Sequence, residues 1–194
     1  MLQEARDEFQ QEMREKKEEG ATVYYLDETG SNIGDIPAYG RSSRGLKVHC
    51  AKKKEKGERI STIAILNPLG VQQAFCYEGT LNGELFAYYT QEFLIPFLQV
   101  GDILVLDNAT AHYNTEAWDM LIDHGIDVRF QPPYSPDMNP IEMAWSKIKG
   151  FIKKQYTKTK EELYMAIEEA IKIITPENSE AYINKCLYRD LLKP

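Results

Sequence analysis

The sequence predicts an α/β fold built on one mixed sheet, in which an antiparallel set of strands is joined to parallel strands through crossover helices. Two observations support this prediction. Short β-branched and aromatic runs follow one another closely before residue 80, and short apolar runs alternate with helical patterns after it. With 194 residues, 43% of them hydrophobic, the chain is long enough for one globular domain with a substantial core.

The first half of the chain contains a charged helix and the antiparallel strands. Residues 1–20 are expected to form an exposed helix, and TVYYLDETG a strand that ends at Asp27 before a Gly turn. Residues 31–45 contain four Gly or Pro residues, which is typical of a loop or hairpin. Three predicted strands follow, the last two separated by an NPLG turn: LKVHCA, RISTIAIL and VQQAFCYE. Their short links predict an antiparallel meander.

The second half alternates helices and strands. NGELFAYYTQEFLIPFLQ has helical periodicity with Asn82 as its N-cap, and GDILVLDN is a short apolar strand typical of a sheet centre. TEAWDMLIDHG is predicted to be a helix that ends at Gly125, and IDVRFQ a strand. Asn139 and Pro140 favour the start of a helix in NPIEMAWSKIKGFIKK. Two more helices follow, of which EELYMAIEEAIKII has an amphipathic pattern that favours a place in the core.

Composition excludes several protein classes. No apolar run reaches the roughly 18 residues that a membrane span needs, and the charged N-terminus is not a secretory signal. The three cysteines are far apart, so we interpret them as reduced thiols of a cytoplasmic protein. A net charge of −7 argues mildly against nucleic acid as a partner. Two segments are nevertheless basic, 41–60 with eight Lys or Arg against two Glu and 141–160 with six Lys against one Glu. Charge alone favours a solvated surface for both.

Three carboxylates are expected at the ends of elements, Asp27 and Asp107 after strands and Glu142 in the first turn of a helix. If the two strands are neighbours, the aspartates repel each other by about 4 kcal/mol at ~4 Å and an effective dielectric of roughly 20. A divalent cation removes this cost, and carboxylate oxygens suit Mg²⁺ or Mn²⁺. Two such ions can activate a water and stabilise a leaving 3′ oxygen in phosphodiester cleavage. The stiff loop QPPYSPDMNP would then fix the helix so that Glu142 reaches the same metals.

Each acid also has a purely structural interpretation. Asp27 in LDETG and Asp107 before Asn108 can be ordinary turn residues. Glu142 follows Asn139 by three residues, as in a capping box, where its only task is to bond the helix N-terminus. Taken singly, each acid is better explained by its local role, and only the combination favours a site.

The combination resembles a known family. LDETG, LVLDNATAH and QPPYSPDMNPIEMAWSKIK resemble, in this order, motifs in the catalytic domain of mariner-type transposases, especially their bacterial insertion-sequence relatives. Asp107 and Glu142 have 34 residues between them, a spacing that this superfamily uses. YGRSSRG, ERISTIAIL and EGTLNGELF also match, so the resemblance covers about residues 20–160. It implies a ribonuclease-H-like fold, two Mg²⁺ or Mn²⁺ ions, DNA cleavage at transposon ends and joining of the freed 3′ ends into TA target sites.

The resemblance also implies roles for individual residues. Asp27, Asp107 and Glu142 would be the catalytic residues and the metal ligands, with the aspartates bridging or flanking the ions and Glu142 completing the second metal site. Asn108 and His112 match family positions beside the site and would support the ligands or position DNA. Five basic residues would contact DNA phosphates: Arg41, Arg44, Lys47, Lys147 and Lys149.

These expectations divide the chain into a charged helical linker (1–20), a catalytic domain (21–160) and C-terminal helices that pack on it or extend it (161–194). Relatives carry helix-turn-helix modules before this domain, for which Met1 leaves no room. We therefore expect a separately expressed catalytic half, the second frame of a split gene or a truncated chain. The implied partners are double-stranded DNA, a second copy in a homodimer or oligomer, and a separate helix-turn-helix part. The implied location is the bacterial cytoplasm, at the nucleoid.

Three functions remain open from the sequence. The leading hypothesis is a metal-dependent DNA strand transferase. The second is a non-catalytic, captured or regulatory transposase fragment that binds DNA or protein, which the presence of all three acids disfavours. The third is a nuclease for RNA–DNA hybrids, which the fold class does not exclude and which the proline loop and the spacing disfavour.

Overall fold

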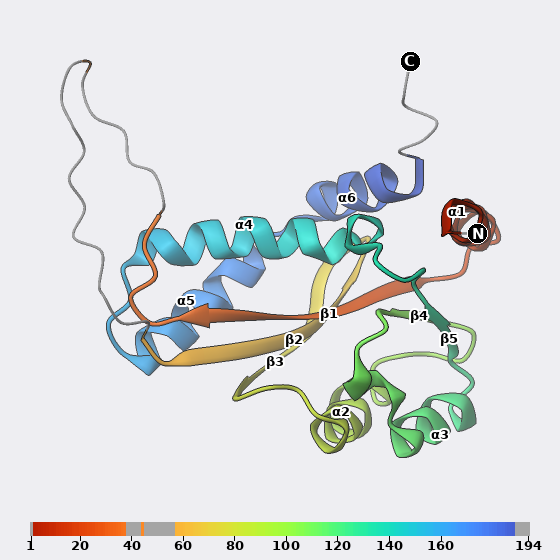
Figure 1. The fold of residues 1–194 in the computed structure, drawn as a ribbon, viewed down its shortest axis with the longest axis horizontal. Coiled ribbons are helices and arrows are strands. Elements are labelled where there is room, and N and C mark those ends of the chain that lie inside the picture. The colour runs from red at the N-terminus through yellow and green to blue at the C-terminus, as the bar shows by residue number, and fades with distance from the viewer. Residues whose placement is uncertain (1, 38–43, 45–56, 189–194) are drawn as a thin grey trace.

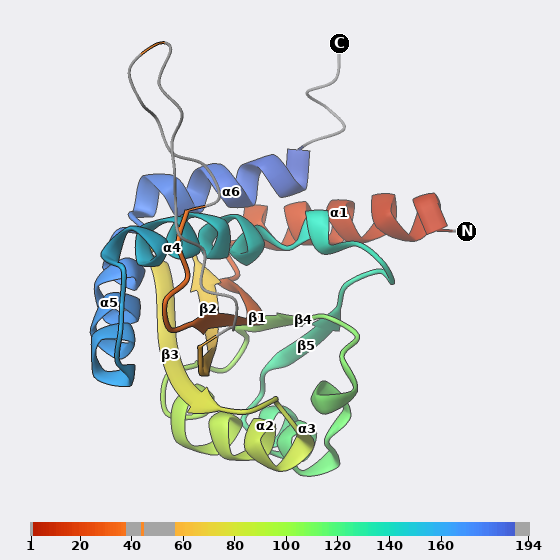
Figure 2. The same ribbon diagram turned by 60° about the vertical axis from the view of Figure 1, so that its left-hand side comes forward.

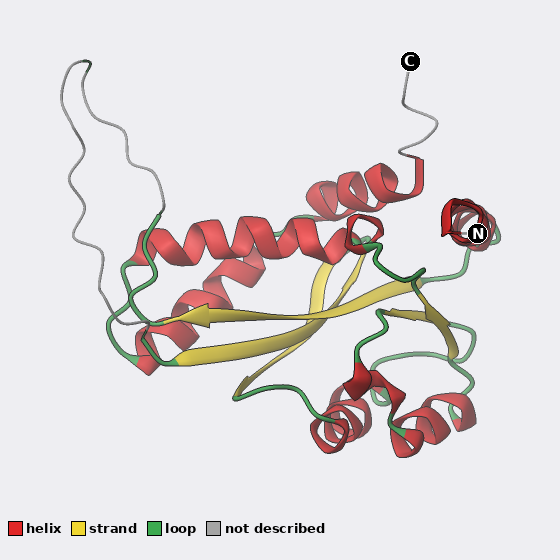
Figure 3. Ribbon diagram, in the orientation of Figure 1, coloured by secondary structure: helices red, strands yellow, loops and turns green. Residues whose placement is uncertain are grey.

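The computed structural model describes residues 2–37, 44 and 57–188. Within these ranges five strands form one mixed sheet in the order β3-β2-β1-β4-β5 (Figures 1 and 3). The strands are β1 Val23–Asn32, β2 Arg59–Asn67, β3 Gly70–Glu78, β4 Ile103–Leu106 and β5 Asp127–Phe130. β1, β2 and β3 pair antiparallel, whereas β4 pairs in parallel with both β1 and β5. The predicted mixed sheet is confirmed, and the predicted LKVHCA strand lies outside the described residues.

Helices cover both faces of the sheet (Figures 1 and 2). On one face lie α1 Leu2–Glu18, α4 Pro140–Gln155, α5 Lys160–Lys172 and α6 Pro176–Tyr188. On the other lie α2 Gly83–Tyr89, its π-helical extension η1 Thr90–Leu94, and α3 Thr115–Asp123. Two short 3₁₀ turns, η2 Thr110–Tyr113 and η3 Pro136–Met138, precede α3 and α4. No helix of the described ranges is long and apolar enough to cross a membrane.

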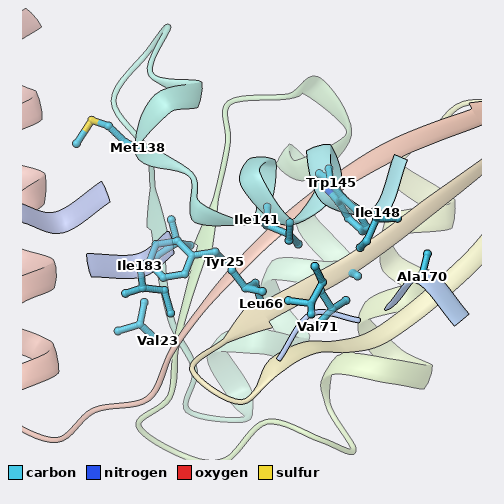
Figure 4. Close-up of a cluster of buried hydrophobic side chains, with 14 of the residues drawn as sticks. Val23, Tyr25, Leu66, Val71, Met138, Ile141, Trp145, Ile148, Ala170 and Ile183 are labelled. Atoms are coloured by element: carbon cyan, nitrogen blue, oxygen red, sulfur yellow. The ribbon is translucent and has the colours of Figure 1, made fainter. Parts of the chain in front are cut away.

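Strand side chains alternate between two hydrophobic cores, as the pleat of a strand requires. In β1, Val23 and Tyr25 belong to the core beneath α4, α5 and α6, whereas Tyr24 belongs to the core above α2 and α3. Figure 4 shows Ile141 and Trp145 of α4 in the same cluster as Tyr25. Because α4 is packed on the sheet from its first turn, the start of this helix is fixed over β1.

Two expectations were wrong, one about the end of the first strand and one about the exposure of the first helix. Asp27 does not end the first strand, because β1 continues to Asn32 and stays paired with β2 as far as Arg59. The helix at residues 1–20 is present as α1, but it is not exposed throughout, since Phe9 and Met13 are buried in the first core. The expected core role of α5 is confirmed by its four buried residues, Leu163, Ala166, Ile167 and Ala170.

Candidate active site

The register of the two central parallel strands brings the aspartates together. β1 and β4 pair Val23 with Ile103 and Tyr25 with Val105. Continued by two residues, this register sets Asp27 opposite Asp107, the first residue after β4. Because both follow Tyr25 and Val105 by two positions, they point to the α4 side of the sheet. The predicted adjacency of the two strands is therefore confirmed.

The proline loop carries the chain from β5 to α4 and ends at a helix cap. The Asn139 side chain accepts a hydrogen bond from the Ile141 N–H at 3.4 Å and donates one to the Leu26 carbonyl at 3.4 Å. The start of α4 is thus joined to β1 one residue before Asp27. The Asn139 N–H donates to the Pro136 carbonyl at 3.1 Å, so the backbone donor that a capping box would offer to Glu142 is already used. The predicted N-cap is confirmed.

The three acids line one cleft of about 460 Å³. Asn108, Asn139 and the loop residues 131–136 complete its wall. Asn108 is held at the rim, where its Nδ2 donates to the Gln131 carbonyl at 2.8 Å and its Oδ1 accepts from the Tyr113 hydroxyl at 3.0 Å. The cleft therefore combines anionic oxygens with side-chain amides on a stiff frame.

Asp27 is an acid of the cleft whose ionised form is disfavoured by its surroundings. Burial raises its pKa to about 7, and the negative charges of Glu142, Asp107 and Glu28 contribute further. A backbone hydrogen bond from Glu28 opposes this rise only in part. The carboxylates are near enough to repel one another, which is the condition that a bound cation would relieve.

The surroundings of Asp107 favour its ionised form, because a buried histidine forms a hydrogen bond with its carboxylate. His112 Nδ1 lies 2.8 Å from Asp107 Oδ1, and this hydrogen bond lowers the pKa of Asp107, with a smaller contribution from the Ala109 N–H. The Ala109 N–H donates to Asp107 Oδ1 at 3.0 Å, and this bond forms the turn that is expected if Asp107 also acts as an ordinary turn residue. On the far side of the imidazole, Nε2 lies 4.0 Å from the Oε2 of Glu28. The sequence indicated His112 but missed Glu28, although two consecutive acids within a predicted strand were a visible signal.

Of the predicted phosphate-binding residues, the three that the structure describes, Arg44, Lys147 and Lys149, do not line the cleft. Lys147 Nζ donates to the Ile173 carbonyl at 3.1 Å and also contacts Asn178, so it joins α4 to the turn between α5 and α6. Lys149 is half-buried on α4, and Arg44 is exposed. Arg41 and Lys47 lie outside the described residues. In the part of the chain that the structure describes, no three His, Cys, Asp or Glu side chains are close enough together to hold a metal ion.

Comparisons with known proteins agree with this geometry. The family model described as "DDE superfamily endonuclease" matches residues 22–164. No curated protein sequence matches the chain. The Mos1 mariner paired-end complex with Mg is similar in structure, with a TM-score of 0.79, 15% identity and coverage of 97% of this chain and 60% of that chain.

Two further solved structures have the same fold. The Mos1 transposase paired-end complex with the left transposon end gives a TM-score of 0.77 at 16% identity, over 97% of this chain and 60% of that chain. The catalytic domain of Mos1 mariner transposase gives 0.69 at 15% identity, over 97% of this chain and 89% of that chain. The chain thus spans about 60% of the length of the Mos1 chains in the paired-end complexes. The expected ribonuclease-H-like fold class is confirmed.

Proposed function

We propose, because this chain belongs to the DDE superfamily endonuclease family, that it is the catalytic domain of a DNA transposase. Its reaction would be metal-dependent phosphodiester hydrolysis at transposon ends, followed by transfer of the 3′-OH strand into TA target DNA. One observation carries the proposal. Asp27, Asp107 and Glu142 come from two strands and a helix far apart in sequence, yet they line a single cleft.

The donor set suits two Mg²⁺ or Mn²⁺ ions. Carboxylate oxygens are the ligands that these hard cations prefer. The pKa of Asp27 is raised by burial first and then by the negative charges of Glu142, Asp107 and Glu28, a repulsion that positive charge would relieve. Structures of Mos1 relatives with Mg and with Mn support this choice of metal. When bound, two such ions supply Lewis-acid stabilisation and an activated water. Because the acids line one cleft without forming a ready three-ligand group, metal binding would draw them closer together.

Side chains of the protein itself have the remaining roles at the site. His112 holds the Asp107 carboxylate in one orientation through its Nδ1 hydrogen bond, which also lowers the pKa of Asp107 and so favours the ionised form that binds metal. Asn139 fixes the first turn of α4, and with it Glu142, against β1. Asp27 carries a proton over part of the neutral pH range in the metal-free protein, which limits repulsion in the cleft. Catalysis then depends mainly on positioning and on charge stabilisation.

The partners follow from the same reaction. We propose double-stranded DNA as the substrate, since Mos1 transposase is seen in complexes with transposon-end DNA. Arg41, Arg44, Lys47 and Lys149 remain candidate phosphate contacts, whereas the bonds of Lys147 within the protein favour a structural role for that residue. A homodimer or oligomer, a separate helix-turn-helix part and a location at the bacterial nucleoid in the cytoplasm complete the proposal.

A second candidate is a non-catalytic transposase fragment that binds DNA or protein. It is favoured by one observation, namely that no three acidic or metal-binding side chains of the described ranges are within reach of one ion. A captured fragment of this kind would keep the fold and the cleft but would neither bind metal tightly nor cut DNA.

A metal titration followed by a cleavage assay separates the two candidates. Mn²⁺ is titrated calorimetrically into the wild type and into Asp107→Asn and Glu142→Gln, and nicking of supercoiled plasmid is then measured in Mg²⁺ and Mn²⁺. Glu116→Gln, an exposed acid on α3, is the matched control. The transposase proposal expects saturable binding and nicking in the wild type and the control, with both lost in the two cleft variants. Weak, equal binding in all four proteins with no nicking would favour the non-catalytic fragment.

A further inference from the structure

Arg6 of helix α1 contacts the proline loop. The Arg6 guanidinium donates from Nη2 to Asp137 Oδ2 at 2.7 Å and from Nη1 to Asp137 Oδ1 at 3.1 Å. The same Nη1 donates to the Ser135 hydroxyl at 2.8 Å. Paired, nearly parallel bonds of this kind fix the relative orientation of guanidinium and carboxylate. Arg6 thus holds two positions of the loop at once, from an element that lies 129 residues away from Ser135 in the chain.

The bonded positions surround the turn that leads into α4. Ser135 precedes η3 and Asp137 lies within it, and Asn139, the cap of α4, follows directly. Tyr134, just before Ser135, has a φ of 55°, a left-handed conformation that is unfavourable for a bulky side chain. A segment that contains such a residue needs support from outside itself. From this turn the chain runs to Glu142 within the first turn of the helix, so a shift of η3 moves the carboxylate.

The C-terminal helix supports the same turn. Cys186 Sγ donates to the Asp137 carbonyl at 3.5 Å, and the Gln10 side chain of α1 donates to the Cys186 carbonyl at 2.7 Å. The contact between α1, α6 and η3 is therefore continuous. In this contact, Arg6 of α1 donates hydrogen bonds to the side chains of Ser135 and Asp137, which lie on both sides of Pro136.

We propose that Arg6 is a positioning residue for Glu142, acting through Ser135 and Asp137. The guanidinium keeps η3 in the one arrangement that directs the first turn of α4 into the acid cleft. Without this contact Glu142 would sample positions outside the reach of a metal shared with Asp27 and Asp107. The inference rests on the proposed function, because it assigns Arg6 a task in building that site. It also makes α1 part of the catalytic unit, where the sequence had suggested a linker.

Arg6→Ala and Arg14→Ala form a matched pair of variants. Both remove a partly buried guanidinium from α1, but Arg14 donates to the Leu187 carbonyl at 2.7 Å and stacks over Tyr188, without a bond to the loop. For Arg6→Ala we expect an apparent Mn²⁺ affinity about tenfold weaker and a kcat for plasmid nicking lowered by a similar factor, with KM for DNA unchanged. Arg14→Ala should keep the wild-type Mn²⁺ affinity and kcat. Arg6→Lys, which retains the charge but not the paired bonds, should fall between wild type and Arg6→Ala.

Hydrogen exchange gives a readout that requires no activity. The amides of Met138, Asn139 and Glu142 are bonded to Ser135, Pro136 and Asn139 carbonyls, so a peptide covering residues 134–143 reports on the order of the turn. Faster exchange in Arg6→Ala than in Arg14→Ala is expected. Equal exchange in the two variants would overturn the proposal whether or not the wild type cuts DNA. Faster exchange with unchanged Mn²⁺ affinity would overturn the positioning role. A wild type without metal binding or nicking would count against the proposed function instead, and the positioning role would fall with it.

Discussion

The Nδ1 of His112 lies 2.8 Å from the Oδ1 of Asp107, and the imidazole is buried directly behind that carboxylate. The ring cannot turn easily, because it packs against Phe86 with ring centroids 4.9 Å apart, and its backbone carbonyl accepts a bond from the Trp118 indole at 2.6 Å. The histidine is therefore a fixed donor, and Asp107 receives both its orientation and its low pKa from it. Supports of this kind around metal ligands are typical of metal sites.

Replacing His112 with alanine should weaken the site without removing a ligand. Asp107 would lose its main donor, so its pKa should rise and its carboxylate should become free to rotate. We expect Mn²⁺ affinity and plasmid nicking to fall by about 10- to 100-fold, the usual cost of losing such a partner. His124→Ala is the control, since His124, at the C-terminal end of α3, contacts the Leu98 carbonyl at 3.1 Å and does not line the cleft. Equal activity of His112→Ala and the control would show that the buried imidazole only fills space.

Asp27→Asn should change how the stability of the metal-free protein depends on pH. The folded protein holds the Asp27 proton with a pKa of about 7, whereas the unfolded chain releases it near the ordinary value of 3.8. The folded state thus binds more protons between these values, and the wild-type free energy of unfolding should fall as pH rises from about 4 to about 7. At pH 8 the asparagine variant should be more stable by on the order of 2–4 kcal/mol.

Urea unfolding in the presence of a chelator, at pH 5 and at pH 8, measures this difference. Asp119→Asn, which removes an exposed acid from α3, should keep the wild-type pH dependence. If Asp27→Asn also followed the wild type, the pKa of Asp27 would not be raised by its burial and by the neighbouring carboxylates.

Asn139→Ala should cost activity beyond its effect on stability. The substitution removes an N-cap, worth roughly 0.5–2 kcal/mol, and also the bond from α4 to the Leu26 carbonyl. Asn82→Ala removes the N-cap of α2, where the side chain accepts from the Leu85 N–H at 2.8 Å and does not line the cleft. Both variants should lose similar stability in urea, but only Asn139→Ala should lose nicking activity, by about tenfold or more. Parallel losses of activity in the two variants would mean that helix capping alone explains the result.

Trp145 offers a test of the packing between α4 and the sheet. The indole is 2% exposed, and its Nε1 has no hydrogen-bond partner among the described residues. Trp145→Phe keeps most of the apolar contact and removes an unpaired polar atom, so it should cost less than about 1.5 kcal/mol. Trp145→Ala should cost about 3–5 kcal/mol because it leaves a cavity. Thermal and urea unfolding check both values, and a large loss in Trp145→Phe would indicate that the indole N–H is satisfied by water.

Local signals in the sequence predicted much of the fold. Asn82 and Asn139 at helix starts, and Gly125 after the end of α3, have short-range causes that a sequence displays. The end of β1 could not be predicted in this way. Residues after Asp27 remain in the strand because β2 pairs with them, from Glu28 with Ile63 to Asn32 with Arg59, and these partners are distant in the sequence.

The sequence indicated the three acids of the candidate site and its neighbours Asn108 and His112, but not the contacts that α1 makes with the proline loop. Asp27, Asp107 and Glu142 belong to motifs with a recognisable order, and the structure places all three in one cleft. The role of Arg6 depends on which loop lies beside α1, and nothing local to residue 6 indicates it. Lys147 is a second residue whose contacts the sequence did not reveal. Its charge suggested DNA, but only the tertiary structure shows that its ammonium group bonds the Ile173 carbonyl at the end of α5.

The position of β1 at the centre of the sheet affects how the chain acquires its structure. Both neighbours of β1 in the sheet follow it in the chain, β2 starting at Arg59 and β4 at Ile103. Other contacts are still less local, such as that of Gln10 with Cys186, which are separated by 176 residues. Folding of such non-local topologies is slow, since long loops must close before their contacts contribute. A chain that lacks α6 should expose part of the core around Tyr25, since Ile183 and Leu187 of α6 belong to that core, and exposed apolar surface of this kind favours aggregation.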